Sequence, residues 1–266
     1  MLSAIIFDMD GTLADTEEIH RQAFNQAFAE FTIDCHWDRD EYKQLLAISG
    51  GRERIRNYLL THNLVNLDRV GITRLAANIH RRKSEIYREK LRSDHIRLRP
   101  GVAELIHAAT NEGIHLGIAT SSSIKNVEAL LKNTLDEQAL ELFDSIVTCE
   151  IVEDKKPSPS VYQYALAELG LMPEHCIAVE DTHNGNRAAL QAGLKTIITT
   201  HAFTTDADFS GASLVVDQLG TADNPFRVIA GNSFGYNHVC LDMLRSILVD
   251  NSAQEGWEDR KTAAAK

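Results

Sequence analysis

The sequence predicts an α/β fold in which a doubly wound parallel sheet carries an inserted helical domain. Two observations predict it. Short, continuous apolar runs alternate with helical patterns along most of the chain, and such runs are typical of strands covered on both faces. One long interval, between the first and second runs, contains helical patterns only. Regular strand–helix alternation favours a parallel sheet, so we interpret the helical interval as an insertion.

The individual elements are predicted from the spacing of apolar residues. Strands are expected at residues 5–7, 115–119, 146–148, 176–179, 196–199 and 214–216. Helices are expected at residues 102–110, 158–169 and 186–192, with a last helix near 241–248. The inserted interval carries apolar side chains at helical spacing throughout.

The expected division of the chain places helices over one edge of the sheet. Residues 1–16 and 91–220 are predicted to form the α/β core, residues 17–90 a helical cap, and residues 221–266 a C-terminal extension with a polar tail. The insertion follows the first strand, and doubly wound sheets bind ligands at the carboxyl ends of their strands. We therefore expect the cap to cover a ligand site there.

Composition and charge exclude several classes of partner. The formal net charge of -11 argues against nucleic acid and anionic membrane surfaces, because both require a basic face. No apolar run approaches the roughly 18 residues of a membrane span, and the first residues lack the pattern of a secretory signal, so we expect a cytoplasmic monomer or weak oligomer. The four cysteines are widely separated and are expected to be packing residues.

Two aspartates, Asp8 and Asp10, follow the first predicted strand in the sequence DMDGT. Like charges at the end of a buried strand require a counter-ion, a shared proton or both. Residues i and i+2 can project to one side, and Gly11 permits a sharp exit of the backbone. The alternatives are a plain turn and a calcium loop, but an EF-hand loop needs glycine at its sixth position and a preceding helix.

Three further polar segments are expected at the same edge of the sheet. The second strand ends in ATSSS, which includes Thr120; KKP, with Lys156, precedes a helix; and the fourth strand ends on Glu180 and Asp181. Read singly, the first is typical of a helix N-cap and the second of a solvated charge run. The acidic pair is the strongest of the three, because a fold rarely ends an apolar strand on two acids without a cation.

Together, in this order and at these spacings, DMDGT, ATSS, KKP and ED resemble the motifs of the haloacid dehalogenase-like hydrolase superfamily over about residues 1–220. The resemblance implies that Asp8 is a nucleophile toward phosphorus and Asp10 a general acid/base. It also implies that Thr120 donates a hydrogen bond to the transferring phosphoryl group and that Lys156 neutralises its charge.

The same resemblance implies a Mg²⁺ cofactor held by Asp8, the Asp10 backbone carbonyl and Asp181, with Glu180 in or near the ligand shell. A carboxylate is a poor nucleophile toward a phosphate dianion because like charges repel, so Mg²⁺ and Lys156 would have to cancel that repulsion. Attack by Asp8 would give an aspartyl-phosphate. Asp10, expected to be partly protonated by its neighbours, would protonate the leaving oxygen and later deprotonate water.

The insertion resembles the cap of the β-phosphoglucomutase-like subgroup. The phrases HRQAFNQAF, WDRDEY, GGRERI and EDTHNGNRAA are similar to those of CbbY-type proteins. That resemblance implies a small phosphosugar partner, such as xylulose 1,5-bisphosphate, and a role in carbohydrate metabolism of the Calvin cycle. His183 and the length beyond residue 220 depart from the family pattern.

The subgroup resemblance also implies which residues bind the substrate. His20, in the hinge into the cap, would orient Asp10, while an arginine and a lysine of the cap would grip a second phosphate. The alternative for Arg81, Arg82 and Lys83 is a solvated helix face. The expected substrate-binding residues are Glu17, His20, Gly51, Arg52, Lys83, Ser121, Ser122 and Asn184.

Three functions are weighed on these residues. A sugar-phosphate phosphatase is the leading interpretation. A phosphosugar mutase would use the same residues and differ only in whether water or a second sugar hydroxyl meets the aspartyl-phosphate. A non-enzymatic sugar-phosphate-binding protein would have no need for Asp10 beside Asp8. The haloacid dehalogenases proper need neither the second aspartate nor a metal.

Overall fold

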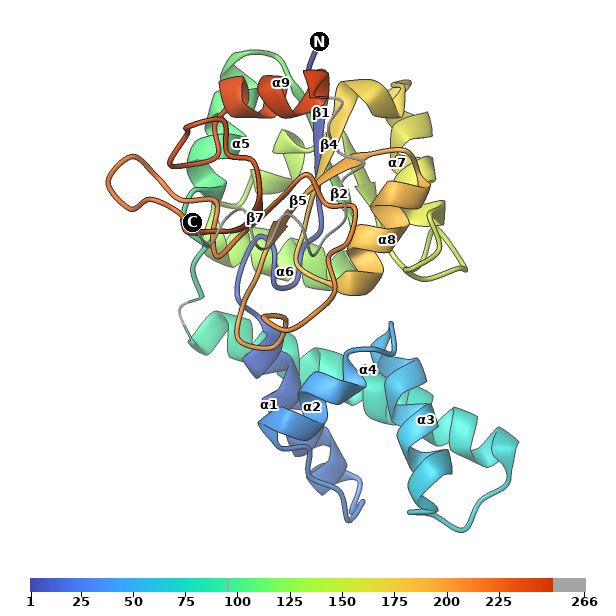
Figure 1. The fold of residues 1–266 in the computed structure, drawn as a ribbon. Coiled ribbons are helices and arrows are strands. Elements are labelled where there is room, and N and C mark those ends of the chain that lie inside the picture. The colour runs from blue at the N-terminus through green and yellow to red at the C-terminus, as the bar shows by residue number, and fades with distance from the viewer. Residues whose placement is uncertain (95, 251–266) are drawn as a thin grey trace.

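The computed structural model describes residues 1–94 and 96–250, and it has an α/β layer with a group of helices beyond one edge of its sheet (Figure 1). The described residues form one seven-stranded sheet in the order β3-β2-β1-β4-β5-β6-β7. All neighbouring pairs are parallel except β6 and β7. The predicted α/β class is confirmed. The strands are β1 (Ala4–Phe7), β2 (His115–Ala119), β3 (Ser145–Val147), β4 (Cys176–Glu180), β5 (Lys195–Thr199), β6 (Leu214–Val216) and β7 (Val228–Gly231).

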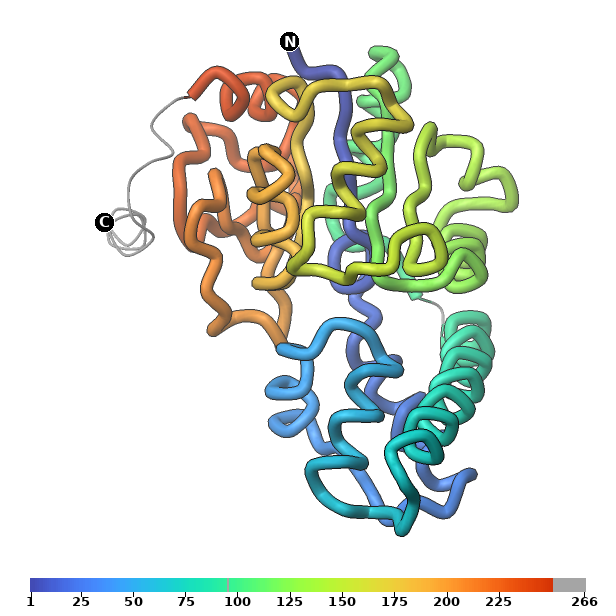
Figure 2. The backbone as a smooth tube through the Cα atoms, turned by 90° about the vertical axis from the view of Figure 1, so that its right-hand side faces the viewer, coloured from blue at the N-terminus to red at the C-terminus, as the bar shows by residue number. Residues whose placement is uncertain are grey.

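The helices fall into two groups, one inserted after β1 and one beside the sheet (Figure 2). None of the helices in the described ranges has both the length and the apolar character that a bilayer crossing requires. The inserted helices are α1 (Glu17–Glu30), α2 (Arg39–Leu45), α3 (Gly51–His62) and α4 (Arg69–Ser93). The others are α5 (Val102–Asn111), α6 (Ile124–Thr134), α7 (Ser160–Leu169), α8 (His183–Gln191) and α9 (Leu241–Val249), with short 3₁₀ turns η1 (Ala139–Leu142) and η2 (Pro173–His175).

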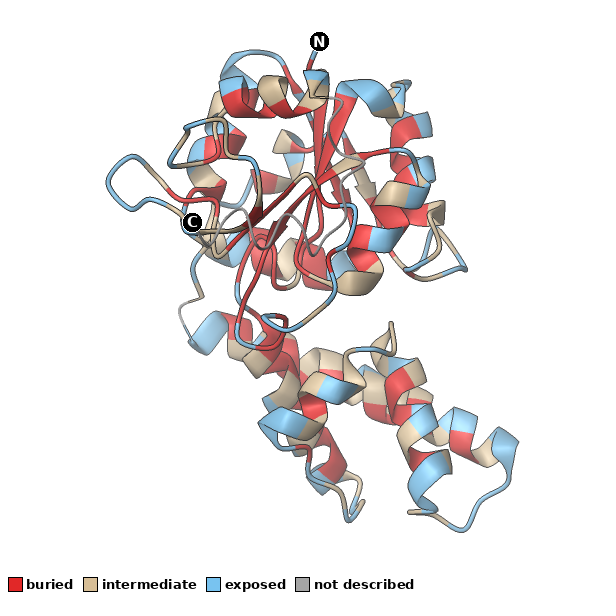
Figure 3. Ribbon diagram, in the orientation of Figure 1, coloured by how far each residue is buried: buried red, intermediate tan, exposed pale blue. Residues whose placement is uncertain are grey.

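The register of the central strands decides where the polar motifs meet. Phe7, the last residue of β1, lies opposite Ile118 of β2 and Val179 of β4. Strand β1 is buried along its whole length, as are most of its neighbours (Figure 3). Because parallel strands end at the same edge, the residues that follow β1, β2 and β4 come together. That edge faces the inserted helices (Figure 1).

The inserted helices pack around an apolar centre of their own. Helix α4 runs along both α1 and α3. Trp37 is fully buried there, with the rings of Phe24, Phe28 and Tyr58 around it. Outward-facing charges pair at the surface, as Arg82 does with three glutamates. The aromatic centre therefore gives these helices a fixed arrangement beside the sheet edge.

Strand β7 is a strand that the sequence did not reveal. The run VIAG is short and ends at Gly231, whose φ of +91° is a conformation that favours glycine. It pairs antiparallel with β6, so part of the expected C-terminal extension belongs to the sheet. Helix α9 forms where leucine spacing predicted a helix, and it packs against α5 and β4. Residues 251–266, which include most of the expected polar tail, lie outside the described residues.

Candidate active site

Lys156 lies at the centre of the acidic edge. Its Nζ atom donates to Asp8 Oδ1 at 2.6 Å, to Glu180 Oε1 at 2.5 Å and to the Ala119 carbonyl oxygen at 2.8 Å. Burial lowers the pKa of Lys156, but the charges and hydrogen bonds of Asp8 and Glu180 outweigh burial and raise it. The structure thus fixes a permanent cation directly against the proposed nucleophile.

The carboxylate of Glu180 contacts Lys156 and keeps its ammonium in place. Its Oε1 also accepts from the Tyr162 hydroxyl at 2.7 Å, and its Oε2 accepts from the backbone N–H of Asp181 at 3.1 Å. A Cβ atom at Gly185 would lie 2.0 Å from this carboxylate, so only glycine lets α8 begin so close to it. Glu180 is fully buried, and its partners compensate for most of the cost of burying its charge.

Asp8, Glu180 and Asp181 form a buried acidic cluster. One carboxylate oxygen of each lies within 4.8 Å of the others. Burial raises the pKa of Asp8, Lys156 lowers it, and the negative charges of Glu180 and Asp181 raise it further, with the net effect well upward. Three carboxylates against one lysine leave an excess of buried negative charge. Oxygen donors at this spacing fit a hard divalent cation such as Mg²⁺.

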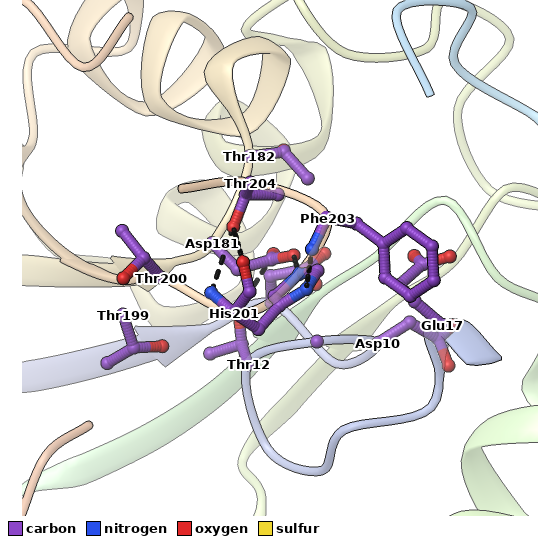
Figure 4. A network of polar contacts seen from close by, with 12 residues as sticks. Asp10, Thr12, Glu17, Asp181, Thr182, Thr199, Thr200, His201, Phe203 and Thr204 are labelled. Carbon is purple, nitrogen blue, oxygen red and sulfur yellow. Dashed lines mark hydrogen bonds and ion pairs between the residues drawn. The ribbon is translucent and has the colours of Figure 1, made fainter. Parts of the chain in front are cut away.

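Asp181 is held from both sides by side chains that precede or follow other strands. Its Oδ1 accepts from Thr12 Oγ1 at 3.1 Å, and its Oδ2 lies 2.8 Å from His201 Nε2 (Figure 4). Gly11 passes so close that a Cβ atom there would lie 2.3 Å from Asp181 Oδ2 and 2.9 Å from His201 Nε2. The glycine of the DMDGT motif therefore leaves room for this pair, and its φ of +86° also favours glycine.

Sequence reasoning missed His201. It comes two residues after the end of β5, at the same edge as the predicted site residues. The available signal was the polar run TTH that follows this strand. No acidic neighbour or motif marked that run, and only the fold shows that it reaches Asp181.

Asp10 accepts four hydrogen bonds. Thr16 Oγ1 at 2.8 Å, Tyr87 OH at 2.9 Å and His20 Nε2 at 2.9 Å meet its Oδ1, while Ser122 Oγ meets its Oδ2 at 2.8 Å. Burial raises the pKa of Asp10, but these partners outweigh burial and lower it well below its usual range. The expectation that Asp10 is partly protonated is therefore wrong for this arrangement. Its neighbours donate to the ionised form instead of sharing a proton with it.

The hydroxyls of Thr120 and Ser122, which follow β2, have different partners. Thr120 is buried, and its Oγ1 accepts from the backbone N–H of Ser122 at 3.0 Å, which turns the chain at the strand end. That hydroxyl retains its own proton for donation. Ser122 is committed to Asp10, as described above. Ser121 lines the cavity beside them.

A cavity of about 160 Å³ lies between this edge and the inserted helices. Its walls combine acids and hydroxyls from the core with aromatic and cationic side chains from the helices. Of the residues predicted to bind substrate, the cavity is lined by Glu17, His20, Gly51, Lys83, Ser121, Ser122 and Asn184. Asp8, Asp10, Thr120 and Lys156 line it from the core.

Lys83 is a buried cation in the cavity wall. Its Nζ lies 2.6 Å from His20 Nδ1 and 4.5 Å from the centre of the Phe24 ring. Burial lowers the pKa of Lys83 to about 7, although the charges of Asp10 and Glu17 raise it. The ammonium donates to His20 Nδ1, so the Nε2 of that ring carries the proton donated to Asp10. Lys83 has no carboxylate in direct contact among the described residues, which leaves its charge available to an anionic ligand.

The structure places Arg52 outside the cavity, contrary to its predicted role. Its guanidinium pairs with Glu53, and its side chain is 57% exposed. Helix periodicity explains the difference, because residues three apart share a face and Gly51 already faces inward. Arg54 lines the cavity instead. It is buried and donates to the Leu45 carbonyl oxygen at 2.9 Å. The prediction from the sequence named Arg52, two positions away, and therefore missed it.

Asn184 lines the cavity and is bound to the loop between α2 and α3. Its Nδ2 donates to the Ala47 carbonyl oxygen and to Ser49 Oγ, both at 3.0 Å. Nearby, Lys155 Nζ donates to Glu53 Oε2 at 2.8 Å. These contacts join the core to the loop before α3 and to the first turn of α3.

Among the described residues, the strand order and the helices α1 to α4 inserted after β1 define an α/β fold with an inserted helical group. The chain belongs to the haloacid dehalogenase-like hydrolase family, which it matches over residues 5–199.

Within that family the chain is similar to CbbY proteins. It is 45% identical to protein CbbY of Cereibacter sphaeroides, an alignment that covers 82% of this chain and 93% of the relative. A crystal structure of a mutant CbbY from Rhodobacter sphaeroides in complex with xylulose-(1,5)bisphosphate superimposes with a TM-score of 0.76 at 43% identity, covering 84% and 98% of the two chains. The fold also matches β-phosphoglucomutase of Clostridium difficile, with a TM-score of 0.64 at 24% identity and 82% and 92% coverage.

Proposed function

We propose that this protein is a Mg²⁺-dependent phosphatase that hydrolyses a sugar bisphosphate, with xylulose 1,5-bisphosphate as the first candidate. The observation that carries the proposal is the contact of Lys156 Nζ with Asp8 Oδ1 inside a buried acidic cluster, with Asp8 and Lys156 lining a cavity. Similarity to a CbbY structure with xylulose-(1,5)bisphosphate supports the substrate class. We also propose residues 17–90 as the cap and a cytoplasmic location.

The proposed first step is attack by the Asp8 carboxylate on phosphorus. The bond from phosphorus to the sugar oxygen breaks, and an aspartyl-phosphate forms at Asp8. Lys156 lowers the repulsion between the carboxylate and the phosphoryl oxygens, and Thr120 donates to one of those oxygens. Asp8, Asp181 and the Asp10 backbone carbonyl would hold Mg²⁺, with Glu180 at the edge of its shell. When bound, the ion would supply further positive charge at the transferring group.

Asp10 is proposed to handle the protons of both steps. Its ionised carboxylate takes a proton from the water that attacks the aspartyl-phosphate, which releases inorganic phosphate and restores Asp8. Asp10 then releases that proton to solvent and returns to its ionised form. In the next turnover Asp10 takes up a proton from solvent once substrate is bound and passes it to the leaving sugar oxygen. Through its Nε2 contact, His20 keeps the carboxylate aimed into the cavity.

The cap side of the cavity is proposed to bind the part of the substrate that does not react. Lys83 and Arg54 supply positive charge for a second phosphate, because both are buried and border the cavity. Glu17 accepts a hydrogen bond from the Tyr42 hydroxyl at 2.8 Å and has lone pairs left for sugar hydroxyls. Ser121 and the backbone at Gly51 complete the proposed contacts.

Release of inorganic phosphate from a panel of phosphosugars, with Mg²⁺ and with EDTA, tests the proposal. We expect release from xylulose 1,5-bisphosphate with Mg²⁺ only, and none from an Asp8→Asn variant. A coupled assay for isomerised sugar phosphate runs beside it. Isomerisation without net phosphate release would show a mutase, and tight sugar-phosphate binding without either reaction would show a binding protein.

A further inference from the structure

His201 and Asp181 form a buried, hydrogen-bonded pair. The His201 side chain is 3% exposed and that of Asp181 is fully buried. Asp181 Oδ2 lies 2.8 Å from His201 Nε2, and the two residues come from the ends of adjacent strands, β5 and β4 (Figure 4). A buried carboxylate without such a partner is costly, so the pair is a fixed part of the site.

The hydrogen bonds around the ring determine which nitrogen carries its proton. The backbone N–H of Phe203 donates to His201 Nδ1 at 3.3 Å, which makes Nδ1 an acceptor. Nε2 is therefore the protonated nitrogen, and it donates to Asp181. The His201 backbone N–H is held in turn by Thr204 Oγ1 at 3.1 Å, which fixes the start of the loop. The ring thus reaches Asp181 in one orientation.

Both oxygens of Asp181 are oriented by donors that do not belong to the acidic cluster. Thr12 holds Oδ1 and His201 holds Oδ2, as described above. Each carboxylate oxygen has a second lone pair, so a donor on one side leaves the other side available to a cation. We infer that His201 is a positioning residue that aims Asp181 at the divalent cation. The inference rests on the proposed function, because it takes Asp181 to be a Mg²⁺ ligand.

Hydrogen-bond partners of metal ligands commonly contribute ten- to a hundred-fold to metal affinity. The test is therefore Mg²⁺ affinity of the full chain, measured by calorimetric titration without substrate. We expect His201→Asn to weaken Mg²⁺ binding at least about tenfold, because its shorter amide does not reach Asp181. We expect His201→Gln, whose amide nitrogen lies near the position of Nε2, to restore binding to within about threefold of the wild type. These two variants differ by one methylene, so their comparison isolates the contact.

A matched control variant separates the effect of the His201 imidazole from the effect of the loop that carries it. Thr204→Val removes the hydroxyl that accepts the His201 backbone N–H but leaves the imidazole beside Asp181. We expect it to bind Mg²⁺ within about twofold of the wild type. A second readout is the KM for substrate at saturating Mg²⁺, which should be unchanged in His201→Asn because that residue is absent from the cavity lining.

The outcomes distinguish this inference from the proposed function. If the wild type binds no Mg²⁺, both fall together. If the wild type binds Mg²⁺ and Asp181→Asn abolishes binding, yet His201→Asn binds as tightly as the wild type, this inference alone falls. Equal weakening by His201→Asn, His201→Gln and Thr204→Val would also overturn it, since the loop and not the imidazole would then be responsible.

Discussion

The acidic edge of the sheet and the inner face of the inserted helices, which form the proposed cap, border one cavity, but they are built in different ways. At the sheet edge, Asp8 follows β1 directly, Glu180 ends β4, and Lys156 lies in the segment before α7. Short contacts of Lys156 Nζ join these three residues. On the cap side, Lys83 and Arg54 project from two separate helices around an aromatic centre. The edge therefore holds charges in mutual contact, whereas Lys83 and Arg54 on the cap side have no carboxylate in direct contact among the described residues.

Under the proposed function, that difference gives the two sides different parts of the reaction. Charges in contact at strand ends suit bond-making, which requires fixed distances. Isolated cations on packed helices suit recognition, because they leave charge for a ligand to neutralise. Substitutions at the sheet edge should therefore reduce turnover, and those in the cap should alter substrate binding. The predictions below test this division in order of decreasing effect.

The largest effect is expected from Asp8→Asn. Without the carboxylate there is no nucleophile, and turnover should fall by at least about 10⁴-fold, as is usual when a covalent nucleophile is removed. The circular-dichroism spectrum should not change. Steady-state phosphate release measures the loss, and a fall of less than about tenfold would contradict the role of Asp8.

Lys156→Met should unfold more easily as well as lose activity. Removal of the ammonium leaves Asp8 and Glu180 buried without their cation, and breaking a buried pair in this way costs about 3–5 kcal/mol. The neighbouring Lys155→Met is the matched control. Its pair with Glu53 is partly exposed, so that variant should lose about 1 kcal/mol or less. Urea unfolding without Mg²⁺ measures the free energy of unfolding of both variants. Equal losses of stability in the two variants would contradict the role of Lys156 as the partner of the buried carboxylates.

Lys83→Met should change how stability depends on pH. The pKa of Lys83 is about 7 in the fold, against 10.5 for an ordinary lysine. Between these values the unfolded chain binds more protons, so the wild type should gain stability as pH rises from 7 to 10, by up to about 1.4 kcal/mol per pH unit. Below pH 7 both states are protonated and the contribution is constant. The variant should lack this rise, and parallel unfolding curves for the two proteins across the range would contradict it.

The same Lys83→Met variant should raise KM for a bisphosphate more than KM for a monophosphate. A charged hydrogen bond to a second phosphate is worth about 1.5–3 kcal/mol, which corresponds to roughly a ten- to hundred-fold rise. An equal rise for both substrates would place Lys83 at the reacting phosphate instead.

The smallest effect is expected from Arg52→Ala. Its guanidinium pairs with Glu53 at the surface, so KM and kcat should stay within about twofold of the wild type, whereas Arg54→Ala should raise KM clearly. Kinetics on the same substrate measure both. A larger change of KM in Arg52→Ala than in Arg54→Ala would show that Arg52, and not Arg54, binds the substrate.

The contrast between the two sides also explains what could be predicted from the sequence. Residues directly after strands were found because parallel strands bring their ends together, so adjacency in sequence becomes adjacency in space. The cap residues depend on helix phase, and a shift of two positions put Arg52 where Arg54 lies. Strand β7 escaped notice because VIAG is short and has no alternation to mark it.

Protonation was harder to predict than position. The spacing of Asp8 and Asp10 indicated that their charges needed partners. It could not show which partners would contact Asp8 and which would contact Asp10. The fold directs Lys156 to Asp8 and the donors of Thr16, Tyr87 and Ser122 to Asp10. Two of those donors lie far from Asp10 in the sequence. Burial raises the pKa of Asp10, whereas His20 contributes most to lowering it, and Thr16 and Ser122 add to the effect of His20.

The central claim is that the Asp8 carboxylate itself attacks phosphorus, and trapping the covalent enzyme tests it most directly. The wild type is mixed with xylulose 1,5-bisphosphate and Mg²⁺, quenched in acid within the first turnover, and its peptides are sequenced by mass spectrometry. We predict a phosphoryl group on Asp8, formed before inorganic phosphate appears. Rapid phosphate release with no phosphoryl group on the protein, or with one on Asp10, would contradict the account.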